Sequence, residues 1–233
     1  MRKQVLAAFV VLLALAIYCF AALPVNVSLL VNQNPLSGSQ WVQMIPANGN
    51  IRATASEGAF SLASSYQDSG CYWIADSFAN DQYATVTVKN YNSNSNDMWM
   101  GPAVRASGTN AATFTGYVLY IGKGSAAPND YAELYLRQNG NWTTEIAHDN
   151  ATVPQTGDVY EIHVVGNSIT TKRNGVAYLS GTDSTLTSGA AGMFFYGGSS
   201  SVRSISNFTA GNEASSRRRP PVVAMFIPRQ PMQ

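Results

Sequence analysis

Short segments in which apolar and polar residues alternate fill residues 26–211, and they constrain the fold more than any other feature of the chain. Apolar side chains occupy every second position of the segments 83–89, 131–137 and 160–164. A period of two over such lengths predicts half-buried β-strands. No part of this region keeps a helical period over three turns, so we expect an all-β domain.

Turn-forming pairs separate these segments. Asn139-Gly140, Asn174-Gly175 and Gly197-Gly198 supply residues that tolerate a positive φ. The second pair lies between the segments 169–172 and 176–179, which predicts a tight hairpin. Many short strands with regular turns are typical of an antiparallel sandwich or barrel.

Composition and charge exclude some classes of function. Only 12% of the 233 residues are charged, against roughly 25% in an ordinary soluble domain. A net charge of +1 gives no field that would attract nucleic acid. Cys71 has no second cysteine within the predicted domain, so we expect a small buried side chain rather than a disulfide.

The N-terminus has the features of an export signal. Arg2 and Lys3 precede an apolar run from Val5 to Leu23. Cys19 and Ala21 offer small residues at the positions that a signal peptidase reads, which predicts cleavage near Ala21 or Ala22. Residues 1–25 therefore predict a signal peptide. The run is also almost long enough to span a bilayer, so an uncleaved membrane anchor is the alternative. Both alternatives place the domain outside the cytoplasm, secreted or extracytoplasmic, with the membrane contacted only through this segment.

The C-terminal residues 212–233 differ in character from the domain. They contain the basic run Arg217–Arg219 and four prolines, and they show no alternation. Such a composition predicts a disordered tail. The alternative is a docking peptide for an acidic surface or a cell-envelope polymer.

A series of short motifs recurs in a characteristic order along the predicted domain. The motifs are Asn34–Trp41, Phe78–Val88, Gly101–Ala106, Gly116-Tyr117, Asn139–Trp142, Gly157–Ile162, Val165–Ile169, Asn174-Gly175 and Ser188–Gly192. Their order resembles the concanavalin A-like lectin/glucanase superfamily, and within it the laminin-G-like jelly rolls. The resemblance implies an antiparallel two-sheet β-sandwich of jelly-roll type. It implies no single function, because this fold carries lectins, hydrolases, lyases and adhesion modules.

Two departures from the family pattern bear on chemistry. Relatives often hold a structural calcium ion with acids at both ends of the domain, where this chain has Ser28–Leu30 and Ser206–Phe208. Calcium prefers carboxylate oxygens, so we expect no metal and no cofactor. The Glu-x-Asp-x-x-Glu motif of the glucanases is also missing, which favours the non-catalytic branch.

Three residues are nevertheless candidates for catalysis. Glu133 and Glu161 both lie opposite the apolar face of their strands. If those strands are neighbours, the two carboxylates face each other as in a glycosidase. His163 shares the outward face of Glu161 and could transfer a proton. The alternative is that all three are ordinary solvated strand residues.

Sugar binding needs flat apolar rings together with amides or guanidinium groups for the hydroxyls. Outward positions of three predicted strands supply such groups. The predicted ligand-binding residues are Trp99, Arg105, Tyr117, Tyr135 and Arg137. The remaining tryptophans, Trp41, Trp73 and Trp142, lie near turns or strand ends and are expected in the core.

These observations favour an exported carbohydrate-binding or surface-adhesion module that holds a glycan or cell-surface polysaccharide on the outer face of one sheet. One alternative is a polysaccharide-degrading hydrolase or lyase of the same fold. The other is a structural cell-envelope or filament protein without a small ligand.

Overall fold

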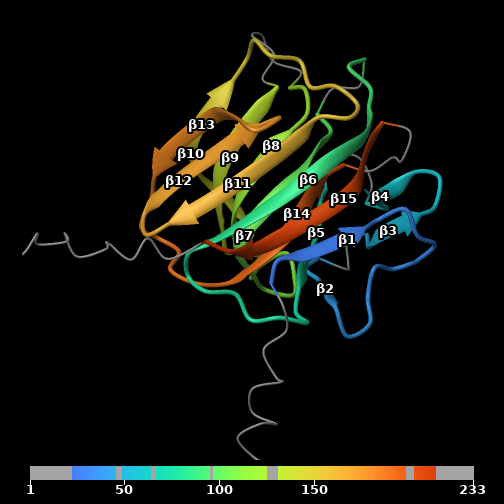
Figure 1. The fold of residues 1–233 in the computed structure, drawn as a ribbon, viewed down its shortest axis with the longest axis horizontal. Helices are drawn as coiled ribbons and strands as arrows, with labels where there is room; N and C mark the ends of the chain where they lie inside the picture. Colours follow the sequence, from blue (N-terminus) through green and yellow to red (C-terminus); the bar gives the residue numbers. More distant parts are fainter. Residues whose placement is uncertain are drawn as a thin grey trace, which may run out of the picture.

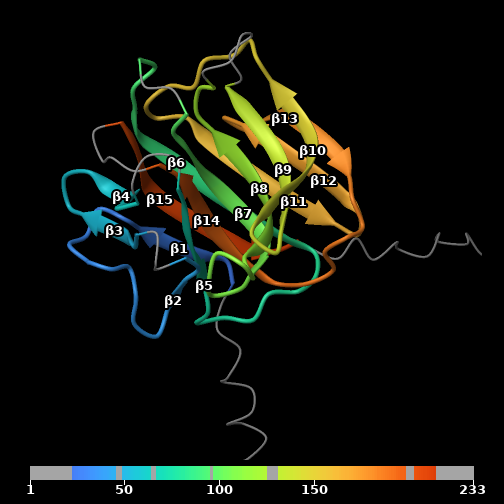
Figure 2. The same cartoon turned by 180° about the vertical axis from the view of Figure 1, so that it is seen from behind.

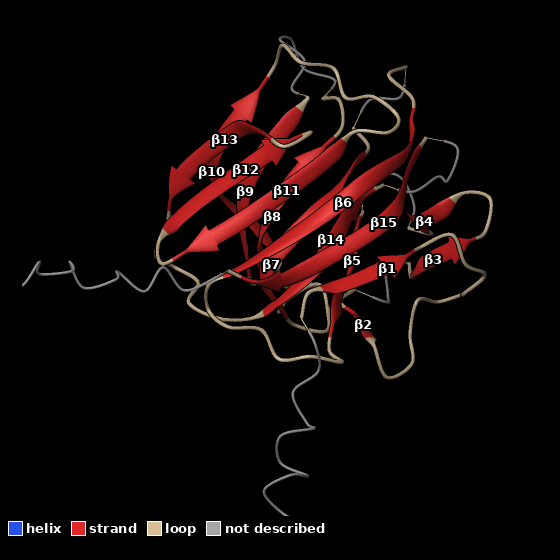
Figure 3. Cartoon of the chain, viewed as in Figure 1, coloured by secondary structure: helices blue, strands red, loops and turns tan. Residues whose placement is uncertain are grey.

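The computed structural model describes residues 23–45, 49–63, 67–94, 97–124, 131–197 and 202–213. The regular secondary structure of these residues consists of β-strands alone, as Figure 3 shows. The predicted signal peptide or anchor and the predicted disordered tail lie almost wholly outside the described residues. Within those residues, no helix has the length and apolar character needed to cross a membrane.

The strands form two antiparallel sheets (Figure 1). In spatial order the eight-stranded sheet contains β13 (Val176–Thr182), β12 (Ser168–Arg173), β11 (Val159–Val165), β6 (Gln82–Tyr91), β15 (Arg203–Asn212), β4 (Gly58–Ser61) and β3 (Ile51–Thr54), with β1 (Val25–Ser28) paired to β15. The seven-stranded sheet contains β10 (Asn141–Asp149), β9 (Ala132–Gln138), β8 (Thr115–Ile121), β7 (Trp99–Ser107), β14 (Ala190–Tyr196), β5 (Asp68–Trp73) and β2 (Trp41–Gln43). Figure 1 looks onto the eight-stranded sheet, and Figure 2 shows the molecule from behind.

The predicted two-sheet sandwich is confirmed, and the alternating segments form its strands. Segment 83–89 lies in β6, where buried and partly exposed residues alternate over eight positions. Asn174 and Gly175 adopt φ values of 52° and 78° and join β12 to β13 in the predicted hairpin. Because the inward side chains of both sheets meet between them, one continuous core fills the sandwich.

Aromatic residues anchor this core. Trp41 and Trp73 pack edge to face with ring centroids 5.0 Å apart, and Phe208 of β15 contacts Trp41 from the other sheet at the same distance. Both tryptophans are buried, as expected from the sequence. Cys71 is fully buried beside them, and burial raises the pKa of its thiol.

Candidate functional site

The outer face of the seven-stranded sheet, the face turned away from the core, carries a second buried apolar cluster. Tyr120 and Val118 of β8 alternate with the core residues Leu119 and Ile121, so their side chains point outward. Phe194 of the nearby β14 joins them, and all three outward side chains are fully buried. An outer sheet face with its own packed cluster is a rigid base for exposed side chains.

Trp142 lies on this base and is partly open to solvent. Its side chain is on β10 and is 39% exposed. Its ring centroid lies 4.7 Å from that of Tyr120, 4.9 Å from Tyr135 and 5.8 Å from Tyr196. Since three tyrosine rings surround it, the indole is held in place without being covered.

Arg137 lies beneath the indole. The two residues are directly opposite in the pairing of β9 with β10, and the guanidinium carbon is 4.1 Å from the Trp142 ring centroid. Arg137 is fully buried and donates a hydrogen bond of 2.5 Å to Asp68 and one of 3.0 Å to the carbonyl of Gly140. Its Nε and Nη1 have no hydrogen-bond acceptor among the described residues.

The ion pair sets the charge state of this base. Burial raises the pKa of the Asp68 carboxyl, and the charge and hydrogen bond of Arg137 oppose that rise. Burial likewise raises the pKa of the Tyr120 phenol well above its ordinary value, so the phenol stays neutral. The outer face therefore presents a neutral, aromatic base with a matched ion pair below it.

Polar side chains continue the same face along β9 and β10. Tyr135 donates a hydrogen bond of 3.2 Å to Glu145. His148 Nδ1 lies 2.5 Å from the other oxygen of Glu145. Glu133 is directly opposite His148 in the strand pairing and points to the same side. These groups can donate and accept hydrogen bonds beside the exposed indole.

The predicted ligand-binding residues divide between this face and the interior. Tyr135 and Arg137 are on the outer face, half-buried and fully buried respectively. Trp99 also belongs to the outer cluster, but it is only 6% exposed and packs against Gly122, so the expectation of an accessible ring is wrong.

Arg105 does not point to the outer face. It lies at a register shift between β7 and β8 and has a φ of 50°, which breaks the alternation that relates it to Trp99. Its guanidinium is buried and donates to three backbone carbonyls, those of Asn80, Leu186 and Gly166. Arg105 therefore ties connecting segments together at one end of the sandwich.

Tyr117 points into the core, contrary to expectation. It has the same parity as the core residues Leu119 and Ile121 of β8. Its hydroxyl donates to the Asp183 carboxylate at 2.6 Å and accepts a hydrogen bond from the Leu186 amide. Burial raises the pKa of Tyr117 to about 12.

The predicted catalytic pair is not formed. Glu133 is on β9 of the seven-stranded sheet and Glu161 on β11 of the eight-stranded sheet, so their outward side chains lie on opposite sides of the sandwich. Glu161 and His163 do share an outer face, with Nε2 and the carboxylate 3.0 Å apart. The other ring nitrogen of His163 contacts Glu213.

Trp142 is the functional candidate that the sequence interpretation placed in the core, and its exposure corrects that placement. A signal for its position is present in the sequence. Asn139 and Gly140 both have a positive φ and form a two-residue turn, which pairs Arg137 with Trp142 across the hairpin. Directly opposed residues share a face, so an aromatic ring above an arginine follows from the turn alone.

Among the described residues, no group of three or more acids, histidines or cysteines could hold a metal ion.

Solved structures with the same arrangement of strands are numerous. Two of them are a carbohydrate-binding module, CBM66 from Bacillus subtilis, and a β-glucanase from Bacillus licheniformis. The module is 16% identical, with a TM-score of 0.51 over 75% of this chain and 93% of the module. The glucanase is 12% identical, with a TM-score of 0.50 over 83% of this chain and the whole of the enzyme.

A third similar structure is the exoplasmic/lumenal domain of VIP36 bound to calcium and Man3GlcNAc. It is 13% identical, with a TM-score of 0.53 over 79% of this chain and 88% of that domain. This chain has the concanavalin A-like fold. Carbohydrate-binding modules, lectins and glucanases share that fold, so the expected architecture is confirmed at the level of the fold. No family model and no curated protein matches the sequence.

Proposed function

We propose that this concanavalin A-like domain is an exported, non-catalytic carbohydrate-binding module that holds a polysaccharide on the outer face of the seven-stranded sheet. The observation that carries the proposal is the partly exposed indole of Trp142 on a packed aromatic base. A pyranose ring offers a flat apolar face to such an indole. Because the base is already packed, the platform loses little conformational freedom on binding.

The charges of this face favour a neutral polysaccharide. The positive charge of Arg137 is matched by Asp68. Glu133 and Glu145 add two carboxylates beside the platform. These two carboxylates would repel an acidic polysaccharide, whereas the hydroxyls of a neutral one can donate hydrogen bonds to carboxylate oxygens.

Two further observations support the proposal. The CBM66 module and the sugar-bound VIP36 domain have this fold, so the scaffold is compatible with glycan binding. The apolar N-terminal run after Arg2 and Lys3 fits a signal for export, which would bring the domain to the cell exterior, where cell-surface polysaccharides are found.

The test is a binding measurement on neutral and acidic polysaccharides with the intact chain and two matched variants. Trp142→Ala removes the exposed ring, while Tyr83→Ala removes a partly exposed ring from the outer face of the eight-stranded sheet. We expect the first variant to weaken binding of a neutral polysaccharide at least tenfold, about 1.4 kcal/mol, and the second to leave it unchanged. Equal binding by both variants would refute the assignment of the site.

A polysaccharide hydrolase is the second candidate, and one observation favours it. Glu145 of β10 is directly opposite Tyr135 of β9, and Tyr135 is two residues from Glu133 on the same strand. The carboxylates of Glu133 and Glu145 are therefore diagonal neighbours on one face. The backbones of diagonal strand neighbours lie about 7–8 Å apart, so the two carboxyl groups can reach the separation of roughly 6.5–9.5 Å that inverting glycosidases use. Release of reducing sugar that is lost in Glu133→Gln and Glu145→Gln, and kept in Glu161→Gln, would establish the enzyme.

A further inference from the structure

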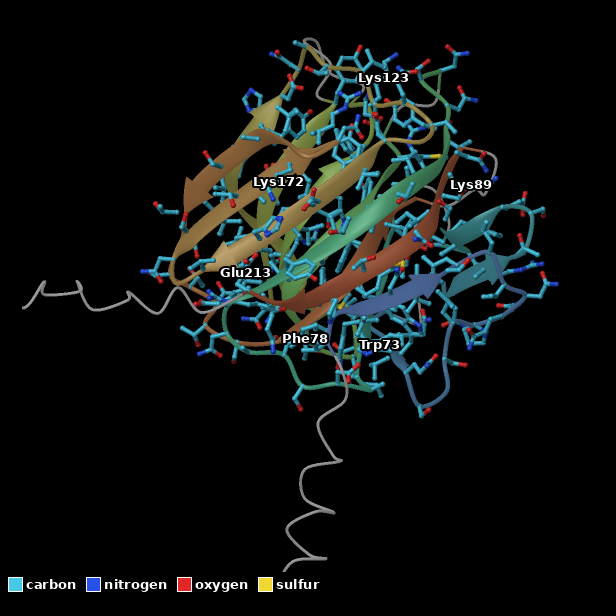
Figure 4. All side chains as sticks on the ribbon, in the orientation of Figure 1. Trp73, Phe78, Lys89, Lys123, Lys172 and Glu213 are labelled. Carbon is cyan, nitrogen blue, oxygen red and sulfur yellow. The ribbon has the colours of Figure 1, made fainter. Side chains whose placement is uncertain are left out.

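A cavity of about 470 Å³ opens beside β1, at the edge of the sandwich and away from the Trp142 platform. Residues 24–28 line it together with Gln40, Trp73 and Asp76. Figure 4 shows Trp73 beside β1 at the lower edge of the molecule. The cavity thus joins an edge strand of the eight-stranded sheet to side chains near the edge of the seven-stranded sheet.

The strand that borders this cavity has an unpaired edge. β1 pairs with β15 alone among the described strands, with Val25 opposite Ala210. The amide of Leu29 continues this ladder by donating to the carbonyl of Ser206 at 2.8 Å. In an antiparallel ladder alternate residues bond to the partner. The backbone N–H and C=O groups of Asn26 and Ser28 therefore point away from β15, where they can pair with a further extended segment.

A carboxylate also lines this cavity. The Trp73 indole donates a hydrogen bond of 2.7 Å to Oδ2 of Asp76, which fixes the side chain. The other oxygen, Oδ1, is buried and has no hydrogen-bond donor among the described residues. Among the described residues, no lysine or arginine lines the cavity. In that part of the chain the cavity thus combines backbone groups that point away from β15 with a carboxylate that has no matching cation.

We propose that the basic segment Arg217–Arg219 of this chain occupies the cavity as a short strand along the open edge of β1, with one guanidinium on Asp76. An arginine fork matches a carboxylate and supplies the missing donor to Oδ1. Pro220 and Pro221 follow immediately and cannot continue the pairing, because they have no N–H. The strand is therefore limited to the three arginines.

The point from which the tail departs fits this occupant. β15 ends at Asn212, two residues past the position that pairs with Val25 at the start of β1. Glu213 is fixed there, since its amide donates to the carbonyl of Asp81 at 3.0 Å and its carboxylate contacts His163. The four residues 213–216 span up to about 14 Å. That length suffices to turn around the start of β1, because neighbouring strands are about 4.8 Å apart.

Hydrogen exchange of the Asn26 and Ser28 amides in the full chain tests the proposal. Replacing all three arginines by serine should accelerate exchange of both amides about tenfold, and Asp76→Asn, which keeps an acceptor for Trp73, should act in the same direction. Asp97→Asn, a charge-matched change in the turn between β6 and β7, should leave both rates unchanged. Slow exchange at Val86 in the centre of β6 shows that each variant is folded.

Three results would overturn the proposal. Unaltered protection in the triple serine variant would mean that another segment covers the edge. Fast exchange in the unmodified chain would mean that nothing does. Protection that rises with protein concentration would assign the occupant to a second molecule rather than to the chain's own tail.

Discussion

Replacing Arg137 by methionine tests the physical basis of the Trp142 platform. The substitution keeps much of the apolar stem but removes the charge that faces Asp68 in a buried ion pair of 2.5 Å. Removing one partner of a buried pair typically costs about 3–5 kcal/mol, because the other charge stays buried. We therefore expect Arg137→Met to lower the free energy of unfolding by that amount at pH 7.

The loss should depend on pH. Burial raises the pKa of Asp68 in the folded protein above its value of about 3.9 in the unfolded chain. Protonation of Asp68 therefore stabilises the folded state. This stabilisation is complete below the unfolded pKa and is lost as the pH rises through the folded pKa. Arg137 limits that rise, and its removal lifts the folded pKa further. The destabilisation of Arg137→Met should therefore be largest at neutral pH and fall by at least half near pH 4.

Urea unfolding at pH 7 and pH 4 measures this directly. With a slope of about 3 kcal/mol per molar urea, the midpoint at pH 7 should fall by roughly 1–1.7 M. Adding Asp68→Leu to Arg137→Met removes the unmatched carboxylate and should restore part of the loss. An equal shift of the midpoint at both pH values, with no recovery in the double variant, would refute the reasoning.

Three other substitutions or probes separate the interior from the platform. Arg105→Met should lower the free energy of unfolding by at least about 3 kcal/mol by urea denaturation, because three backbone carbonyls lose charged donors, and polysaccharide binding by the folded fraction should not change. Tyr117→Phe should lower the free energy of unfolding by about 1–3 kcal/mol, because the Asp183 carboxylate and the Leu186 amide lose their hydrogen-bond partner. An unchanged urea midpoint would contradict a stabilising role for the Tyr117 hydroxyl. Cys71 should react with a thiol reagent only after unfolding, since it is fully buried and burial raises its pKa, so reaction in the native protein would contradict the placement.

The strands and their pairing were largely predictable, because the alternation that defines them is local. The hairpin at Asn174-Gly175 follows from two residues that tolerate a positive φ. The core positions of Trp41 and Trp73 were also predicted correctly. These features depend on side-chain period and turn chemistry, which the sequence displays directly.

The accessible face was less predictable, because it depends on which sheet each strand joins. The alternation of side chains along each strand correctly predicted outward positions for Glu133 and Glu161. Their strands belong to different sheets, however, so the two side chains do not share a face. A register shift turned Arg105 inward, and no residue pattern around it signals that shift. Arg137 is buried at an outward position because Asp68 of the distant strand β5 also pairs with it, a tertiary contact that no period reveals.

The four tryptophans differ in solvent exposure, and this difference has a spectroscopic consequence. Trp41, Trp73 and Trp99 are 4%, 5% and 6% exposed, whereas Trp142 is 39% exposed. A water-soluble quencher such as iodide should therefore reach one of the four indoles in the native protein. Occupation of the platform by a sugar would shield that indole, so unlabelled protein carries its own reporter of binding, separate from the emission that reports unfolding.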